Sequence, residues 1–396
     1  MYWRVNRHRG LTNGANSKGV NLNHQKIKGT LKKFKAHFPE SLQHLGVQTW
    51  RAIEFPLAAV IERRSIINAH RIVWPAVEVA DFDRFKMLGP ADDDVLVRVA
   101  FTLMSPGTER AQLLGLPGAY EHIPDIPYFP GYSGSGKVIA MGKKVTEFRV
   151  GDRVAGRCQH GSPAVIQKEF LFRIPDGVSL EEAAFIELGI IGLQGIRKAQ
   201  IKPGESVLVL GQGLIGQLAN RLSRLAGGAP IVAVARSKAK AKESLGKGGA
   251  DRFSTIDDLR PQDEAFDVVI EATGDPNIFP FAANLARTGG RVIGLGTPRG
   301  WGRILLGQDG CRPGITIKGA HITGMPERDR SNGLWTYRSE GQLFLDLLSQ
   351  HRLTLGDLIT RRADPSQAGE IYESLGAGDS RVLGVIFDWT AYGGNG

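Results

Sequence analysis

The feature that most constrains this chain is a glycine-rich turn directly after an apolar strand pattern. The run Ser206–Leu210 is typical of a buried strand, and it leads into Gly211-Gln212-Gly213-Leu214-Ile215-Gly216. In such a turn the first glycine permits the tight bend, the second lets the backbone approach a pyrophosphate, and the third allows the next helix to pack closely. That helix would offer free N–H groups and a positive dipole end to the phosphates. We therefore predict a dinucleotide site at Gly211, Gly213, Leu214, Ile215 and Gly216.

A lone turn of this kind is common by chance, and it could also be a strand-to-helix turn without a ligand. The residues around it favour the ligand, because strand patterns alternate with helical ones as in βαβ units. Six strands are predicted, at Ser206–Leu210, Ile231–Ala235, Arg252–Ser254, Phe266–Glu271, Arg291–Leu295 and Ile315–Ile322. This number matches a complete doubly wound parallel sheet, so the chain is predicted to be of the α/β class.

The end of the second strand indicates which dinucleotide is bound. A carboxylate there would bind the ribose hydroxyls of NAD, but this chain has Ala235. Arg236, Ser237 and Lys238 follow, and they can offer hydrogen bonds and positive charge to a 2′-phosphate. We therefore expect NADP(H) to be favoured over NAD(H), although the same residues could form a solvated loop.

Two later turns also follow strands of the predicted sheet. Thr273 and Gly274 come after the fourth strand, and Gly296 comes after the fifth. Because ligands in open α/β sheets lie outside the carboxyl ends of the strands, we expect these three residues to border the cofactor. Each turn could equally be a plain loop.

The chain before the glycine turn is β-rich and broken by Gly and Pro. Strands are predicted at Ile67–Trp74, Val95–Val99, Lys137–Ala140, Asp152–Ala155 and Glu169–Ile174, a spacing that suggests a small barrel-like domain. Ser179 and Glu182 have the spacing of a helix capping box. An amphipathic helix around 343–348, a second helix around 367–375 and a strand at Val382–Phe387 are expected to return to this domain. The predicted division is 1–66 as a basic extension without folded structure, 67–195 with 342–396, and 196–341.

Charge and cysteine content limit the partners and the compartment. Residues 1–67 hold twelve Lys or Arg against three acidic residues, so most of the formal charge of +10 lies there. This extension could be an organelle presequence, an interaction segment or the product of an upstream start. The rest is nearly neutral and has no apolar run of the roughly 20 residues that span a bilayer, so we expect no nucleic-acid or membrane partner. Only two cysteines are present, which favours a reducing, cytoplasmic location.

Several segments together resemble the medium-chain dehydrogenase/reductase superfamily over almost all of residues 67–396. The segments are Asp94–Val99, Ser105-Pro-Gly-Thr-Glu109, Phe129–Gly136, Gly151–Val154, Ile201–Val207 and the glycine turn. The resemblance implies a GroES-like β-rich catalytic domain, a Rossmann domain inserted before its C-terminal part, and hydride transfer between them. Ser105–Glu109 with Pro130-Gly-Tyr132 is most similar to the branch that contains bacteriochlorophyllide hydroxyethyl dehydrogenases.

The departures from this family concern zinc. Zinc-dependent members place a Cys ligand where this chain has Pro106, and a His ligand where it has Tyr132. The loop with four structural cysteines is missing after Arg157, and Glu187 matches a carboxylate near the metal in polyol-type members. Catalytic zinc needs three protein ligands, so we expect no metal. A different set, Cys158, His160, His122 and Glu109, lacks metal-ligand spacing and is more simply explained as loop and packing residues.

Hydride transfer without a metal still needs a group that stabilises the substrate oxygen and supplies a proton. We expect Tyr132 to donate to that oxygen, Thr108 to pass the proton outward, and Glu187 to orient either group or act as a base. The alternatives are a packed Tyr132 whose hydroxyl bonds to backbone, a local turn hydroxyl at Thr108, and Glu109 as a partner of Arg110 or of another basic side chain.

The predicted function is a zinc-independent, NADP(H)-dependent oxidoreductase acting on a small-molecule carbonyl/alcohol pair or an activated C=C bond. A homodimer is compatible with this prediction. Two alternatives remain open: a zinc-dependent alcohol or polyol dehydrogenase with unrecognised ligands, and a dinucleotide-binding sensor that has lost its chemistry.

Overall fold

The computed structural model divides the chain into two units, Met1–Ile66 and Ile67–Gly396. It describes residues 64–116, 127–260, 265–305, 307, 313–326, 335–379 and 382–392. The predictions made for residues 1–63, and for His122, lie outside the described residues. None of the helices in these ranges is long and apolar enough to cross a membrane.

The second half of the chain forms a six-stranded parallel sheet in the order β11-β10-β9-β12-β13-β14. The strands are β9 Val207–Leu210, β10 Ile231–Ala235, β11 Arg252–Thr255, β12 Phe266–Glu271, β13 Ala286–Gly294 and β14 Thr316–Gly319. The chain reverses its direction of winding between β9 and β12, as in a doubly wound dinucleotide fold. The predicted α/β class and all six strands are confirmed.

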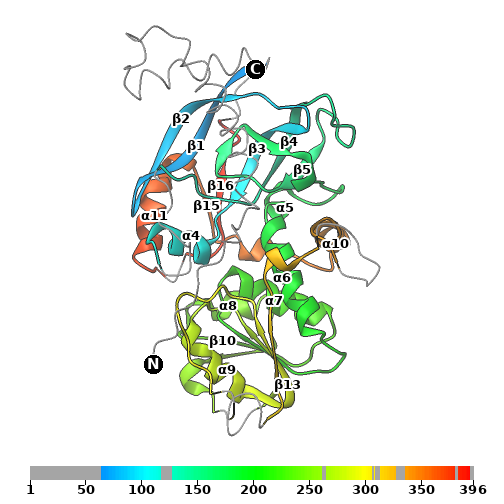
Figure 1. Cartoon of the computed structure of the whole chain (residues 1–396), viewed down its shortest axis with the longest axis vertical. Helices are drawn as coiled ribbons and strands as arrows, with labels where there is room; N and C mark the ends of the chain where they lie inside the picture. Colours follow the sequence, from blue (N-terminus) through cyan, green and yellow to red (C-terminus); the bar gives the residue numbers. More distant parts are fainter. Residues whose placement is uncertain are drawn as a thin grey trace, which may run out of the picture. The chain divides into compact units, whose positions relative to one another are not determined.

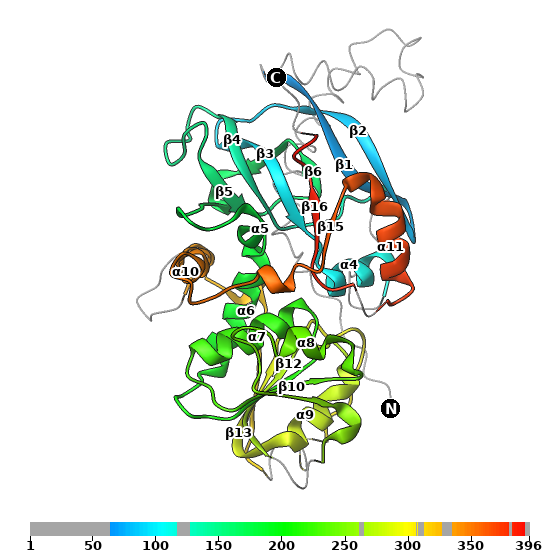
Figure 2. The same ribbon diagram turned by 180° about the vertical axis from the view of Figure 1, so that it is seen from behind.

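Helices cover both faces of this sheet, and the side chains of β9 show why. Val207 and Val209 point to the face covered by α6 (Ile186–Ala199) and α7 (Leu214–Leu225). Leu208 and Leu210 point to the face covered by α9 (Phe279–Leu285). A strand buried on both sides reads as a continuous apolar run, which is the pattern found here. Figures 1 and 2 show α7 and α9 on opposite sides of the sheet.

The β-rich part holds a seven-stranded sheet and a three-stranded sheet. The larger sheet contains β3 Asp94–Leu103, β4 Gly134–Met141, β5 Arg153–Gly156, β7 Ala164–Gln167, β8 Leu171–Arg173, β15 Arg361–Ala363 and β16 Val385–Asp388. The smaller one contains β1 Ile66–Ala76, β2 Val79–Leu88 and β6 Gly161–Ser162. The last strand, β16, pairs antiparallel with β3, so the end of the chain joins the sheet formed near its beginning (Figure 2).

Several predicted elements differ from the observed ones. The strand predicted at Glu169–Ile174 is shorter, because residues 168–170 form a 3-10 turn before β8. The strand predicted at Ile315–Ile322 ends at Gly319, and a 3-10 turn follows at Ile322–Gly324. Strands β2, β6, β7 and β15 were not predicted. They are short or polar, so their pairing is set by neighbouring strands and not by local pattern.

Capping residues begin two of the helices near the site. Ser179 caps α5 (Leu180–Ala183) by accepting from the Glu182 N–H at 3.1 Å. The second half of the predicted capping box is wrong, since the Glu182 carboxylate instead accepts from the Ser179 hydroxyl and from the N–H of Leu355. The helix α10 (Tyr337–Ser349) begins with a capping box of Thr336 and Ser339. The helix α11 (Ala368–Gly376) follows before β16.

Candidate active site

The three glycines of the turn have three different surroundings. Gly211 has φ +90°, and a Cβ there would lie 2.8 Å from the Thr273 side chain. A Cβ on Gly216 would lie 1.8 Å from the Gly211 carbonyl oxygen. The helix α7 can therefore lie this close to the turn only because residue 216 is glycine. A Cβ on Gly213 would meet nothing within 4 Å, and Gly213 is the N-cap of α7. The open space therefore lies at the helix N-terminus, where a pyrophosphate would be bound.

A buried polar cluster fixes the turn from beneath. The Gln212 amide donates to the Val209 carbonyl at 3.0 Å, and its oxygen accepts from Asn220 at 2.8 Å and Ser244 at 3.0 Å. Asn220 belongs to α7, and Ser244 to α8 (Ala241–Ser244). Gln212, between the first two glycines of the turn, is thus hydrogen-bonded to two helices. The glycine motif did not predict this role.

A pocket of about 310 Å³ lies at the carboxyl ends of these strands. Its lining residues lie at the ends of five strands, β9 to β13, or in the loops after them: Leu210, Gly211, Val234, Ala235, Arg236, Ile256, Thr273, Gly274, Asp275, Pro276, Ile278 and Arg299. The predicted residues Gly211, Arg236, Thr273 and Gly274 are therefore together. We call this space the cofactor pocket.

Not every predicted cofactor residue lines this pocket. The Ser237 hydroxyl caps the 3-10 turn Lys238–Lys240, and the charge of Lys238 acts on the carboxylate of Asp258. Gly296 packs against Gly274, which lines the pocket, since a Cβ on Gly296 would lie 2.6 Å from the Gly274 N atom. Arg299, which the sequence did not single out, both lines the pocket and donates to the carbonyl of Gly107 in α4 (Pro106–Leu113).

The turn after β12 is shaped by one carboxylate. Glu271 is buried, and its Oε1 accepts from the Thr273 hydroxyl and from the N–H groups of Thr273 and Gly274. Burial raises the pKa of Glu271, and the hydrogen bonds from Thr273 oppose that shift. The Thr273 side chain is therefore held by Glu271, which fixes the position of this wall of the cofactor pocket.

Tyr132 lies between two hydroxyl groups of the Ser105–Glu109 segment. Its phenol donates to Ser105 Oγ at 2.7 Å, and Thr108 also hydrogen-bonds it. Ser105 is the N-cap of α4, but its hydroxyl makes no cap hydrogen bond and instead accepts the hydrogen bond from Tyr132. Burial raises the pKa of Tyr132 to about 12, so the phenol keeps its proton at ordinary pH. The structure thus brings together Tyr132 and Thr108, and the alternative in which the Tyr132 hydroxyl bonds only to backbone is wrong.

Glu109 is the partner of a basic side chain other than Arg110, namely His160. Glu109 is fully buried, and its carboxylate accepts from the Ser105 N–H at 2.7 Å and the Tyr372 hydroxyl, and lies 3.2 Å from His160 Nε2. Arg110 instead donates to the carbonyls of Leu375 and Gly376. Glu109 and His160 therefore form a buried support for the segment that carries Ser105.

Glu187 lies in the first turn of the helix α6 and is almost completely buried. Its N–H donates to Ser133 Oγ at 3.2 Å, and the Tyr337 hydroxyl donates to its Oε1. Its Oε2 lies 3.2 Å from Nη2 of Arg157. Burial raises the pKa of Glu187, while Arg157 and Tyr337 work against that shift. Ser133 follows Tyr132 directly in the chain, so its contact with Glu187 brings Glu187 close to the segment that carries Tyr132.

The side chains of this site do not fit a zinc ion. The one carboxylate at the site already has a guanidinium at 3.2 Å, whose charge would repel a dication. In the described ranges, which omit 117–126, no three His, Cys, Asp or Glu residues are placed to hold a metal.

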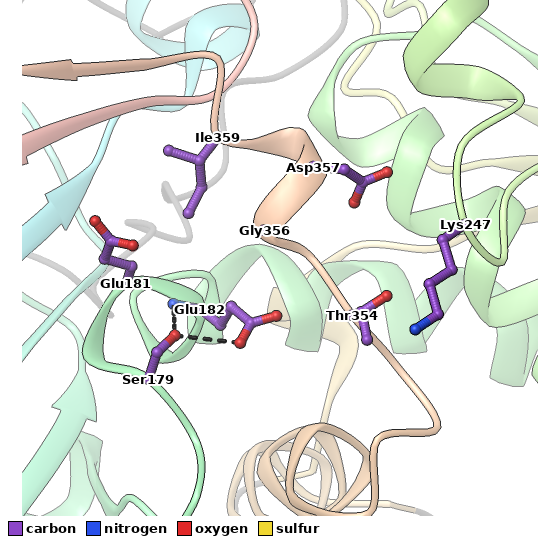
Figure 3. Close-up of a pocket in the computed structure, with 8 residues that line it drawn as sticks. All are labelled: Ser179, Glu181, Glu182, Lys247, Thr354, Gly356, Asp357 and Ile359. Carbon is purple, nitrogen blue, oxygen red and sulfur yellow. Dashed lines mark hydrogen bonds between the residues drawn. The ribbon is translucent and has the colours of Figure 1, made fainter.

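A second pocket, of about 390 Å³, is lined by Ser179, Glu181, Glu182, Lys247, Thr354, Gly356, Asp357 and Ile359 (Figure 3). Two of its carboxylates form ion pairs that stabilise the fold. Glu181 pairs with Arg362 at 2.6 Å, and Asp357 pairs with the buried Arg221 of α7 at 2.7 Å. These partners leave the carboxylates with structural roles, so we do not include this pocket in the active site.

Comparisons with known proteins agree with this arrangement. Residues 91–184 match the family described as "Alcohol dehydrogenase GroES-like domain". The chain is 26% identical over 331 residues to a probable D-xylulose reductase A of Aspergillus clavatus, covering 72% of this chain and 87% of that protein. It is 34% identical over 151 residues to a quinone oxidoreductase-like protein 2 homolog of Nematostella vectensis, covering 36% of this chain and 40% of that protein.

A solved structure shares the fold. It is a putative zinc-binding dehydrogenase from Sinorhizobium meliloti bound to NADP, with a TM-score of 0.68 and 20% identity, covering 81% of this chain and 99% of that one. The parallel sheet, the GroES-like domain and these relatives lead to one conclusion. The chain is an alcohol-dehydrogenase-like oxidoreductase, with a GroES-like domain and a Rossmann-like parallel sheet.

Proposed function

We propose that this chain is a zinc-independent, NADP(H)-dependent oxidoreductase in which Tyr132 is the proton donor and acceptor. The observation that carries the proposal is the Tyr132 phenol, hydrogen-bonded to Ser105 and Thr108 at the place of the missing His ligand. When bound, the dinucleotide supplies or accepts the hydride. The chain must then stabilise the substrate oxygen and exchange a proton with it.

The residues around Tyr132 suit that task. With its pKa raised to about 12, Tyr132 is a neutral donor over the whole physiological range. A phenol that gives up its proton needs a route for a replacement, and the Thr108 side chain is exposed while Ser105 is buried. We propose that Thr108 passes the proton to and from solvent, and that the Glu187 carboxylate orients the site.

The preference for NADP(H) rests on the end of β10. Arg236 lines the cofactor pocket next to Ala235, and no carboxylate stands at Ala235 to bind a ribose hydroxyl pair. A guanidinium gives a 2′-phosphate charge-assisted hydrogen bonds. Solved structures of the same fold carry NADP in one case and NADH in another, so the preference rests on the residues at the end of β10.

The proposed substrate is a small carbonyl compound or the corresponding alcohol. Similarity to a probable D-xylulose reductase over most of the chain favours this class. An activated C=C bond is the second candidate, favoured by the 34% identity to a quinone oxidoreductase-like protein.

One set of measurements tests the proposal. NADPH and NADH are titrated against the purified protein, its metal content is determined, and NADPH absorbance is followed with aldehydes, ketones, quinones and enones. We expect tighter binding of NADPH, turnover after exhaustive chelation, and no stoichiometric zinc. Turnover that chelation abolishes and zinc restores would favour the zinc-dependent alternative. Tight cofactor binding with no turnover on any compound would favour the sensor.

The remaining expectations are part of the same proposal. We propose the division into 67–195 with 342–396 and 196–341, a cytoplasmic location, and a small-molecule substrate without a nucleic-acid partner. A homodimer is supported by the edge strand β14, whose Ile317 side chain is 40% exposed. Light scattering of the purified protein tests the dimer, and cell fractionation tests the location.

A further inference from the structure

The loop after β13 places an arginine at the cofactor pocket. Arg299 is half-buried and lines this pocket, where it is one of two arginines, the other being Arg236. The proposed function assigns Arg236 to the 2′-phosphate and leaves Arg299 without a task. The sequence did not indicate Arg299 either, because it lies outside both the glycine turn and the end of β10. Its contacts therefore decide what it can bind.

Arg299 is held at both of its ends. Its backbone N–H donates to the Gly274 carbonyl at 3.0 Å, in the turn that forms another wall of the pocket. Its guanidinium donates from Nη2 to the carbonyl of Gly107, in the first turn of α4. These two hydrogen bonds hold a long side chain with many rotamers in one region of space. Less entropy is then lost when a ligand binds the guanidinium.

No negative charge of the protein balances this guanidinium. Among the residues that the structure describes, none has a carboxylate within ion-pair distance of Arg299, and its Nε and Nη1 groups have no hydrogen-bond partner. The one carboxylate in the pocket lining, Asp275, accepts from the Asn277 N–H at 2.9 Å. Burial lowers the pKa of Arg299, and the like charge of Arg110 adds to that shift. A half-buried arginine with unused donors and no carboxylate is suited to a negatively charged ligand.

The order of the strands indicates which part of a dinucleotide would meet Arg299. The sheet runs β11-β10-β9-β12-β13, so Arg236 after β10 and Arg299 after β13 lie on opposite sides of the glycine turn after β9. In this fold the adenosine ribose lies at the end of the second strand, which is β10 here, and the pyrophosphate lies at the glycine turn. The pyrophosphate is therefore the anionic group of the dinucleotide on the Arg299 side of that ribose.

We propose that Arg299 binds the pyrophosphate of the dinucleotide, together with the N–H groups at the start of α7. The guanidinium gives the phosphate oxygens charge-assisted hydrogen bonds through donors that Gly107 does not use. Because Gly107 lies in the Ser105–Glu109 segment, the same side chain links the bound cofactor to the segment whose Ser105 accepts from Tyr132. The inference rests on the proposed function, and it concerns a group that NADPH and NADH share.

Calorimetric titration with three ligands separates the two arginines. NADPH carries a 2′-phosphate and a pyrophosphate, NADH carries only the pyrophosphate, and 2′-AMP carries only the 2′-phosphate. R299Q is compared with R299K and R236A, and R303Q is the matched control. Arg303 lies in the same segment as Arg299, but it is exposed and is not among the residues that line the pocket.

We expect R299Q to weaken NADPH and NADH by the same factor of about tenfold or more, which is the effect of losing one charge-assisted hydrogen bond. Its affinity for 2′-AMP should stay within about twofold of the wild type, because the 2′-phosphate site is separate. R236A should show the reverse pattern, with NADPH and 2′-AMP weakened and NADH unchanged. R299K keeps the charge and should lose less affinity than R299Q. R303Q should bind all three ligands as the wild type does.

Two results would overturn the inference. One is an R299Q protein whose affinities for both dinucleotides equal those of the wild type. The other is an R299Q protein that loses as much affinity for 2′-AMP as for the dinucleotides, since the substitution would then disturb the whole pocket. The proposed function fails separately, through tighter binding of NADH than of NADPH to the wild type or through absent turnover. Selective loss of NADH affinity in R299Q would support the pyrophosphate contact even then.

Discussion

The open space beside Gly213 makes one substitution especially informative. In G213A the new methyl group meets no atom within 4 Å, and Gly213 has φ −73°, which alanine adopts readily. Alanine is a poorer N-cap than glycine, at a cost of up to about 1 kcal/mol, and it loses less backbone entropy on folding, a gain of about 0.4–1 kcal/mol. We expect these effects nearly to cancel, so the free energy of unfolding should change by less than about 1 kcal/mol.

Cofactor binding should respond very differently. The same methyl group occupies the space through which the pyrophosphate reaches the N–H groups of α7. Losing one charge-assisted hydrogen bond costs about 1.5–3 kcal/mol, which is roughly 10- to 150-fold in Kd. We expect NADPH to bind about 100-fold more weakly to G213A.

Fluorescence titration of NADPH and urea unfolding measure the two quantities. G324A is the matched control, since a Cβ there also meets nothing within 4 Å and Gly324 belongs to the 3-10 turn Ile322–Gly324, not to the glycine turn. G216A is the opposite case, with its Cβ 1.8 Å from a carbonyl oxygen, and should lose about 1–3 kcal/mol of stability. NADPH affinity in G213A within threefold of the wild type would refute the assignment of this turn to the phosphates.

Three further predictions concern individual side chains. Y132F should lower kcat about 100-fold with unchanged NADPH affinity, because it removes only the proton donor. The control is Y392F, which loses a hydroxyl bonded to Asp364. Equal kcat in both variants would contradict the role of Tyr132. R236A should weaken NADPH about tenfold and leave NADH unchanged; equal weakening of both would argue against a 2′-phosphate contact. Because the folded-state pKa of Glu187 is raised, its contribution is fully present below the unfolded pKa of about 4.5 and is lost as pH rises through the folded value. E187Q should therefore show a smaller fall in unfolding free energy than the wild type as pH rises from about 4.5 to 7.5, and identical slopes in urea unfolding would reject the raised pKa.

The parallel sheet could be predicted because its signals are local. The strand before Gly211 is apolar at every position, as a strand covered by helices on both faces must be, and the glycines mark the turn that follows. The β-rich part was less predictable. The strand β2 alternates half-buried and exposed side chains, and β6 has two residues, so the pairing partners decide that they are strands.

The candidate site divides in the same way. Tyr132, Thr108 and Glu187 could be picked out by their places in recognisable segments. Ser105 as acceptor for Tyr132 and His160 as the partner of Glu109 could not, since neither relation is implied by spacing along the chain.

The sequence by itself determined the dinucleotide turn, the α/β class and the departure from the zinc-ligand pattern. These depend on short-range requirements, namely which residues tolerate a positive φ, a close helix approach or a buried strand. Only the tertiary structure decided what stands at the site instead of those ligands. Arg157, Glu187 and Tyr337 are 30 and 150 residues apart along the chain, and folding places their charges and hydroxyls within hydrogen-bonding distance. Electrostatic interaction depends on distance in space and on burial, and neither quantity can be read from the order of residues.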